Sequence, residues 1–139
     1  MSAGTRVTPL VVLWDADSLL ASLALRVCPV SVRIRTFLAD ELTWEGFRAA
    51  QRDPAAAVDA SGVVPTAVLL GPAVLRNPGR LRLIHHLHRS ADVYLLACGS
   101  FSTHESLLAS ELGVATTVST LHDAIAAGKA IGRFLLAAA

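Results

Sequence analysis

The sequence predicts one α/β domain, doubly wound and Rossmann-like, in which a mostly parallel sheet carries helices on both faces. Apolar, strand-like runs alternate along the chain with segments of helical periodicity. Hydrophobic residues make up 53% of the chain and charged residues only 17%, so there is enough apolar material for strands that are buried on both sides. The length of 139 residues matches one ordinary domain, and we expect residues 1–139 to form a single unit.

Five segments are predicted to be strands. Three of them, Val7–Trp14, Val63–Leu70 and Val93–Cys98, are continuous apolar runs, which are typical of strands buried on both faces. Val30–Phe37 alternates apolar and polar residues, as a half-buried strand does. Val114–Val118 is short and rich in β-branched residues, which favours a fifth strand.

Helices are predicted between these strands. Helical patterns or boundaries occur at Ser18–Val27, Ala39–Gln51 and Arg80–Arg89. Capping boxes at Ser102 and Thr120 open two more helices, of which the first ends near Gly113 and the second runs toward the C-terminus. Ala55–Gly62 is predicted to be a loop.

Composition excludes several classes of function. The net charge of +1 provides no strong field to attract nucleic acid or anionic lipid. No run of about 18 uncharged apolar residues is present, so we expect no membrane association, and the first nine residues do not resemble a signal peptide. Cys28 and Cys98 lack metal-ligand spacing and are predicted to be reduced thiols, which favours a cytoplasmic location. A short apolar chain is also compatible with a homodimer.

The ends of the predicted strands are where chemistry is expected, because doubly wound folds bind ligands outside the carboxyl ends of their strands. Asp15 and Asp17 follow the first strand directly. Two unpaired carboxylates there would repel each other, which favours a hard cation such as Mg²⁺ or a shared proton. The structural alternative is that Asp17 caps the next helix and Asp15 is a surface acid.

The residues around this acid pair resemble a known family, the haloacid dehalogenase-like phosphohydrolases. Its first motif is similar to Trp14-Asp15-Ala16-Asp17-Ser18-Leu19-Leu20. Its second motif, an apolar strand that ends in Ser or Thr, is similar to the segment ending at Ser100, and its third is similar to Gly128-Lys129. The spacing of these motifs suits a member with a small insert or cap within residues 20–75.

This resemblance implies a Mg²⁺-dependent phosphatase that acts on a small phosphorylated substrate. Asp15 would attack the phosphorus atom to form an aspartyl-phosphate, and Asp17 would act as general acid and base. Ser100 and Lys129 would bind the phosphoryl group, while Mg²⁺ would be held at Asp15 and Asp17. The family's fourth motif is acidic, and no acidic residue follows Lys129. We therefore expect a truncated or catalytically impaired member.

Two other families remain open. The chain also resembles response-regulator receiver domains, in which the third strand ends in the phosphorylated Asp; here Thr66–Leu70 is followed by Gly71-Pro72. This resemblance implies a receiver that cannot be phosphorylated and that acts as a protein-interaction or regulatory domain. A resemblance to PIN-domain ribonucleases of toxin systems implies instead that Asp15, Glu41 and Asp92 gather Mg²⁺ for RNA cleavage. Nucleic acid is an expected partner only in that case.

One further cluster stands apart from the acid pair. The predicted helix Arg80–Arg89 is rich in cationic and titratable side chains: Arg80, Arg82, His85, His86, His88 and Arg89. We interpret this cluster as a solvated basic face, with contact to phosphate or RNA as the alternative. Cys98 is interpreted as a buried core thiol rather than a nucleophile, because no base is placed for it by spacing.

Overall fold

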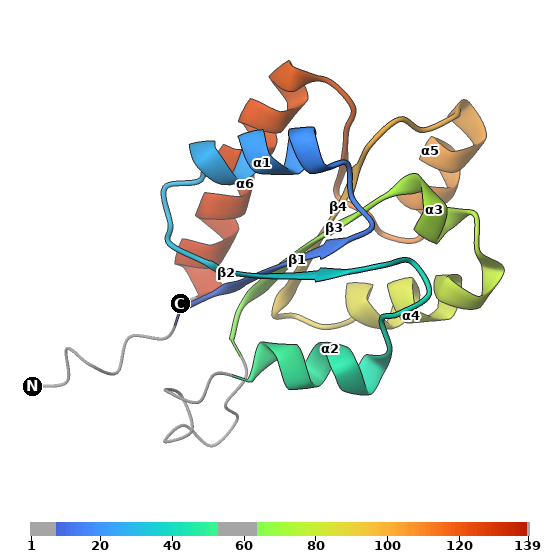
Figure 1. The fold of residues 1–139 in the computed structure, drawn as a ribbon, viewed down its shortest axis with the longest axis horizontal. Helices are drawn as coiled ribbons and strands as arrows, with labels where there is room; N and C mark the ends of the chain where they lie inside the picture. Colours follow the sequence, from blue (N-terminus) through green and yellow to red (C-terminus); the bar gives the residue numbers. More distant parts are fainter. Residues whose placement is uncertain (1–7, 53–63, 139) are drawn as a thin grey trace, which may run out of the picture.

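A five-stranded, all-parallel sheet forms the centre of the protein in a computed structural model that describes residues 8–52 and 64–138 (Figure 1). Its strands are β1 (Leu10–Trp14), β2 (Arg33–Phe37), β3 (Thr66–Leu70), β4 (Val93–Cys98) and β5 (Thr116–Val118). They lie in the order β2-β1-β3-β4-β5, which is the flavodoxin-like order of doubly wound folds. The predicted fold class is therefore confirmed.

Helices cover both faces of the sheet. The elements are α1 (Ser18–Val27), α2 (Trp44–Gln51), α3 (Pro72–Leu75), α4 (Pro78–His88), α5 (Thr103–Glu111) and α6 (Leu121–Ala138). Side chains alternate along each strand, so β1 supplies two separate cores. Val11 packs with α1 and α6 on one face, whereas Leu10, Val12 and Trp14 pack with α2, α3 and α4 on the other. Because helices cover both faces of these strands, the sequences of β1, β3 and β4 are almost continuously apolar.

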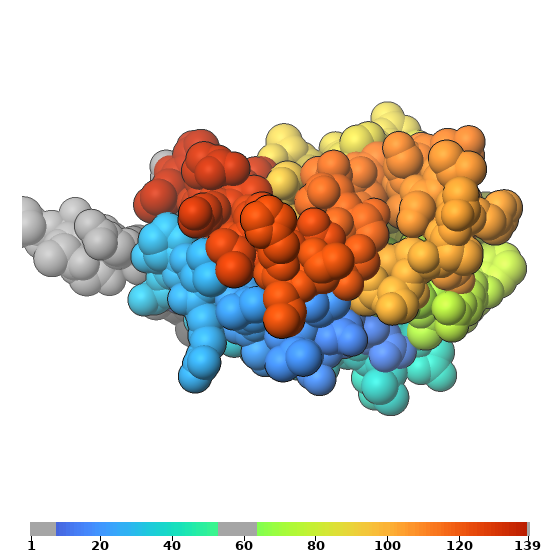
Figure 2. Space-filling model, turned by 90° about the horizontal axis from the view of Figure 1, so that it is seen from above, coloured from blue at the N-terminus to red at the C-terminus, as the bar shows by residue number. Residues whose placement is uncertain are grey.

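The layer formed by α1 and α6 is held by close backbone contact. In the space-filling view, α6 in orange and red lies directly against α1 in blue (Figure 2). Gly128 of α6 is buried, and a Cβ at this position would overlap the carbonyl oxygen of Ala24 in α1 and approach Val27. Gly132 packs in the same way against the ring of Pro29. The two helices approach this closely because α6 presents glycines to α1.

The structure differs from the expected elements mainly at β2 and α2. β2 begins at Arg33 rather than at Val30, and because it is an edge strand its Ile34 is 49% exposed. α2 begins at Trp44 rather than Ala39, because Thr43 caps it by accepting a hydrogen bond from the backbone N–H of Gly46. The short helix α3 was not predicted. The expected loop Ala55–Gly62 lies outside the described residues.

The stretch that the phosphatase resemblance assigns to an insert is part of the main fold. Between residues 20 and 75 the described chain contributes α1, β2, α2, β3 and α3. Both strands of this stretch pair directly with β1, which makes it the source of two of the five strands. Among the helices of the described residues, none combines the length and the apolar character that crossing a membrane requires.

α5 begins with the capping box that the sequence predicts. The Ser102 hydroxyl accepts a hydrogen bond from the Glu105 N–H at 3.1 Å, and the Glu105 carboxylate accepts one from the Ser102 N–H at 2.9 Å. The other Glu105 oxygen accepts a hydrogen bond from the Arg76 guanidinium, which lies just after α3. These bonds, above all the one from Arg76, lower the pKa of Glu105 from its ordinary value of 4.5 to about 2.

Replacing Glu105 by Gln is expected to reduce the sensitivity of the fold to acid. Because the folded-state pKa of Glu105 is lowered, its ionised form stabilises the protein above about pH 4.5, and this stabilisation is lost as the pH falls toward 2. Gln keeps the capping box but does not titrate. Urea unfolding measured from pH 6 to pH 2 should therefore show a smaller loss of stability in E105Q than in the wild type. Equal losses in both proteins would contradict the assigned pKa.

Candidate functional site

Asp15 stands at the carboxyl end of β1, where the chain turns sharply. Its φ of 53° lies in the left-handed region, which Asp tolerates better than most residues. The backbone N–H of Asp15 donates to the carbonyl of Phe37 at 2.8 Å. One oxygen of its carboxylate accepts the N–H of Ala39 at 3.0 Å. Asp15 therefore fastens the chain that leaves β2 to the end of β1.

Gly71, the first residue after β3, lies directly under this turn. A Cβ at Gly71 would overlap the carbonyl oxygen of Asp15, and the Gly71 N–H donates to the carbonyl of Trp14 at 2.9 Å. The carboxyl ends of β1 and β3 are the switch point of this fold, where ligands commonly bind. Here the backbone of Asp15 closes over the end of β3 at that point, and no room is left for a side chain at position 71.

Asp17 is the N-cap of α1. Its carboxylate accepts the N–H of Leu20 at 3.0 Å, which confirms the structural alternative considered for this residue. Its backbone N–H donates to the carbonyl of Cys98 at the end of β4, at 3.1 Å. The Cys98 thiol in turn contacts the Asp17 carbonyl at 3.8 Å. The segment from Asp15 to Asp17 thus crosses the end of β3 and is attached to β4.

Cys98 is confirmed as a buried thiol. Its side chain is inaccessible to solvent. Burial, followed by the nearby charge of Asp17, raises the pKa of Cys98 to about 12. The thiol stays protonated at neutral pH, and a protonated, buried thiol is a poor nucleophile. Cys98 is therefore a packing residue of this edge.

Ser100 and Lys129, the expected phosphate-binding residues, occupy different places. Ser100 is exposed, two residues after the end of β4, on the same sheet edge as the acid pair. Lys129 lies eight residues into α6, which is about 12 Å along the helix from its start. Its neighbour Gly128 packs on Ala24, in the second half of α1. Within the described chain, no hydrogen bond or ion pair joins either residue to Asp15.

Glu41 and Asp92, the acids of the nuclease set, are also separated from each other. Glu41 is exposed in the loop between β2 and α2, where its carboxylate accepts the N–H of Leu38 at 2.7 Å. Asp92 immediately precedes β4 and so lies at the amino edge of the parallel sheet. The length of β1, about 16 Å, separates that edge from Asp15. The structure does not bring Asp92 to Asp15.

At this edge the expected magnesium ligands are the two carboxylates of Asp15 and Asp17. Nowhere in residues 8–52 and 64–138 do three His, Cys, Asp or Glu side chains gather closely enough to hold a metal ion. Each member of the acid pair also accepts a backbone N–H through its carboxylate. Binding of Mg²⁺ by Asp15 and Asp17 stays a prediction, and we assign no chemical step to the ion.

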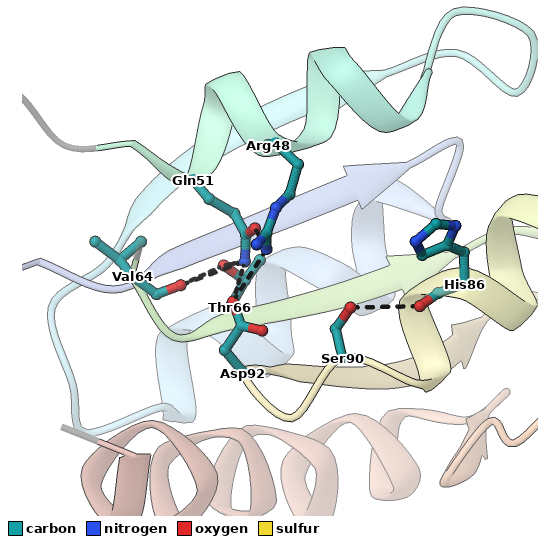
Figure 3. Close-up of polar contacts among 7 residues, drawn as sticks. All are labelled: Arg48, Gln51, Val64, Thr66, His86, Ser90 and Asp92. Atoms are coloured by element: carbon teal, nitrogen blue, oxygen red, sulfur yellow. Dashed lines mark hydrogen bonds and ion pairs between the residues drawn. The ribbon is translucent and has the colours of Figure 1, made fainter. Parts of the chain in front are cut away.

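A second polar cluster, at the opposite edge, was missed from the sequence. Gln51 of α2 is fully buried; Figure 3 shows Arg48 and Gln51 reaching from α2 toward Thr66 and Asp92. The Gln51 amide donates to Thr66 Oγ1 at 3.0 Å and to the Asp92 carboxylate at 2.8 Å, and its oxygen accepts a hydrogen bond from Arg48 at 2.6 Å. Gln51 also contacts the Val64 carbonyl. These bonds fix α2 against β3 and β4.

The basic face of α4 carries two adjoining hollows that the sequence did not indicate. The first, about 370 Å³, is lined by Arg82, His85, His86, Arg89 and Ser90. The second, about 240 Å³, is lined by residues of α4 and of the start of α2: Leu42, Thr43, Trp44, Gly79, Arg80, Arg82, Leu83 and His86. Arg82 and His86 border both hollows, which therefore adjoin, and we call the two hollows together the α4 depression.

Comparison of the chain with profiles of known families, with curated proteins and with solved structures finds no match.

Proposed function

We propose that the protein is a non-catalytic, receiver-like regulatory domain that acts through contacts with another protein chain. The observation that carries this proposal is Gly71. In the receiver resemblance the phosphorylated Asp would stand at the end of β3, and here that position holds a glycine under the carbonyl of Asp15. The strand order β2-β1-β3-β4-β5, which receivers share, supports the same proposal.

The acid pair has a structural role in this proposal. Asp15 holds the loop after β2 through Ala39, and Asp17 caps α1 and joins β4 through its backbone. Both residues shape the carboxyl edge without any reaction. A cytoplasmic location is part of the proposal, because Cys28 and Cys98 are both free thiols that a reducing compartment would preserve.

A phosphohydrolase of the haloacid dehalogenase type is the second candidate, and one observation favours it. Asp15, Asp17 and Ser100 all follow carboxyl ends of strands on the same edge of the sheet. They would be the nucleophile, the acid and base, and a phosphate-binding hydroxyl on a small phosphate monoester. The nuclease candidate lacks comparable support because Asp92 lies at the other edge.

Hydrolysis of p-nitrophenyl phosphate separates the two candidates. With Mg²⁺ in large excess over the protein, we expect no hydrolysis above that of a buffer blank. We expect the same result for D15N, because Asn also tolerates the left-handed conformation and accepts the Ala39 N–H. Incubation with acetyl phosphate should add no phosphoryl group, as judged by the intact mass.

Three results of these assays would contradict the expectations or change their interpretation. Mg²⁺-dependent hydrolysis by the wild type that is lost in D15N would show that Asp15 is a nucleophile, and the phosphohydrolase would replace the regulatory domain as the proposed function. If D15N is as active as the wild type, Asp15 is not the nucleophile, and a contaminating phosphatase is the expected source of the activity. A second, independently purified preparation should then show no hydrolysis. A phosphoryl group that acetyl phosphate adds and hydroxylamine removes, as expected of an aspartyl-phosphate, would contradict a receiver that cannot be phosphorylated.

A further inference from the structure

The α4 depression, which consists of the two adjoining hollows over α4 and the start of α2, has two chemically different parts. Its first hollow is cationic: Arg82 and Arg89 are both exposed, and His85 and His86 lie between them. Its second hollow has an apolar and aromatic lining that includes Leu42, Trp44 and Leu83. A ligand that fills both parts must carry negative charge at one end and a flat or apolar group at the other.

The aromatic part is held rigidly. The Trp44 ring stacks on His86 with centroids 3.9 Å apart and lies 6.0 Å from the ring of Phe47. The Arg48 guanidinium sits 5.1 Å from the centre of the same Trp44 ring. Arg48 is in turn fixed by Gln51 and by Asp92, so the polar cluster at the amino edge also positions Trp44. A preorganised aromatic wall reduces the entropic cost of binding a planar ligand.

Within residues 8–52 and 64–138, no ion pair joins an acidic side chain to the arginines of the first hollow. This hollow lies at the C-terminal half of α4, where the helix dipole places about half a negative charge. The two guanidinium groups together carry two positive charges, which exceeds this partial negative charge. The last carbonyls are also engaged: the His85 carbonyl accepts the Arg89 N–H, and the His86 carbonyl accepts the Ser90 hydroxyl (Figure 3). The nearby carboxylate of Asp92 pairs with Arg48 and with Gln51.

We propose that this depression binds a nucleotide, with its phosphates between Arg82 and Arg89 and its base in the hollow beside Trp44. Guanidinium groups bind phosphate through charge-assisted hydrogen bonds, and the apolar lining of the second hollow suits the ring of a base. The first hollow, at about 370 Å³, is within the size range of small-molecule sites, and the second adds about 240 Å³ beside it. A net charge of +1 supplies no extended basic track for a polymer, which favours a single nucleotide over RNA. This site is independent of the proposed regulatory function.

NMR titration of ¹⁵N-labelled protein with ADP, pyrophosphate and adenosine tests the proposal. ADP is expected to shift the amide signals of α4 and the indole signal of Trp44, whereas the indole signal of the buried Trp14 should move little. Because both parts of the depression contribute, we expect ADP to bind at least about tenfold more tightly than pyrophosphate or adenosine. Higher salt should weaken ADP binding, since the arginines are exposed.

Matched variants separate the two parts of the site. R82Q/R89Q is expected to weaken ADP binding about tenfold or more, because the phosphate contacts are lost. The control R26Q/R133Q removes the same charge from exposed positions on α1 and α6, on the other face of the sheet, and should leave ADP affinity unchanged. W44L should weaken ADP binding and leave pyrophosphate binding unchanged. Circular dichroism of each variant verifies that it is folded.

Four results would overturn the inference. The first is the absence of ADP-induced shifts in α4 at millimolar concentration. The second is an equal loss of affinity in R82Q/R89Q and R26Q/R133Q, which would show attraction by net charge alone. The third is that pyrophosphate binds as tightly as ADP, which would show that the base contributes nothing to binding. The fourth is a single-stranded RNA decamer that shifts α4 when ADP does not.

Discussion

Gly71→Ala is expected to destabilise the protein by about 3 kcal/mol or more, at the upper end of the range for overpacking. The new Cβ would overlap the carbonyl oxygen of Asp15, which is backbone and cannot rotate away as a side chain does. The turn after β1 would have to lift from β3. That movement strains the hydrogen bonds from Gly71 to Trp14 and from Asp17 to Cys98.

Urea unfolding followed by circular dichroism measures this effect, with Gly79→Ala as the matched control. At Gly79 the added Cβ would meet only the Asn77 side chain, at 3.2 Å. Since Ala also favours a helix over Gly, the control should remain within about 1 kcal/mol of the wild type. A Gly71→Ala protein as stable as the control would show that the turn over β3 is not closely packed.

Gly128→Leu is expected to cost about 2–3 kcal/mol by forcing α6 away from α1. The backbone of Ala24 and the side chain of Val27 occupy the space that any side chain at position 128 would need. Leucine has a higher helix propensity than glycine by about 1 kcal/mol, which offsets only part of this cost. Movement of α6 would also disturb Ile131 and Leu135, which are fully buried in the core below the helix.

Thermal unfolding provides the comparison with Ala126→Leu, an exposed position two residues earlier in the same helix. The midpoint of Gly128→Leu should fall by roughly 6–12 °C for a domain of this size, while Ala126→Leu should unfold near the wild-type temperature. Similar midpoints for the two variants would mean that α1 and α6 can separate without cost. That result would contradict the close helix contact shown in Figure 2.

Much of the fold could be predicted because its elements are encoded locally. β4 has the predicted bounds Val93–Cys98, and α1 has the predicted bounds Ser18–Val27. The capping boxes at Ser102 and Thr120 also form as expected. Each of these signals depends on residues within one or two turns or along one strand, so the sequence contains it directly. The helical pattern over Ala39–Gln51 did not indicate that α2 begins only after Thr43, which caps it.

The candidate site was predictable only in part. The sequence placed Asp15, Asp17 and Ser100 after strands, and all three lie at the carboxyl edge. Spacing could not show that Asp92 lies at the amino edge, or that Lys129 lies well along α6. Nor could it show that Trp44 and His86, 42 positions apart, are stacked. Such contacts depend on how whole helices and strands pack against one another, and local periodicity carries no information on this packing.

The sequence by itself determined the alternation of strands and helices, the doubly wound class and the two acids after β1. Only the tertiary structure decided what those acids do. The order β2-β1-β3-β4-β5 places Gly71 against Asp15, Cys98 against Asp17 and α4 beside α2. Hydrophobic burial drives the elements together without direction, whereas close packing and hydrogen bonding select one arrangement. The role of each polar residue is set by that arrangement.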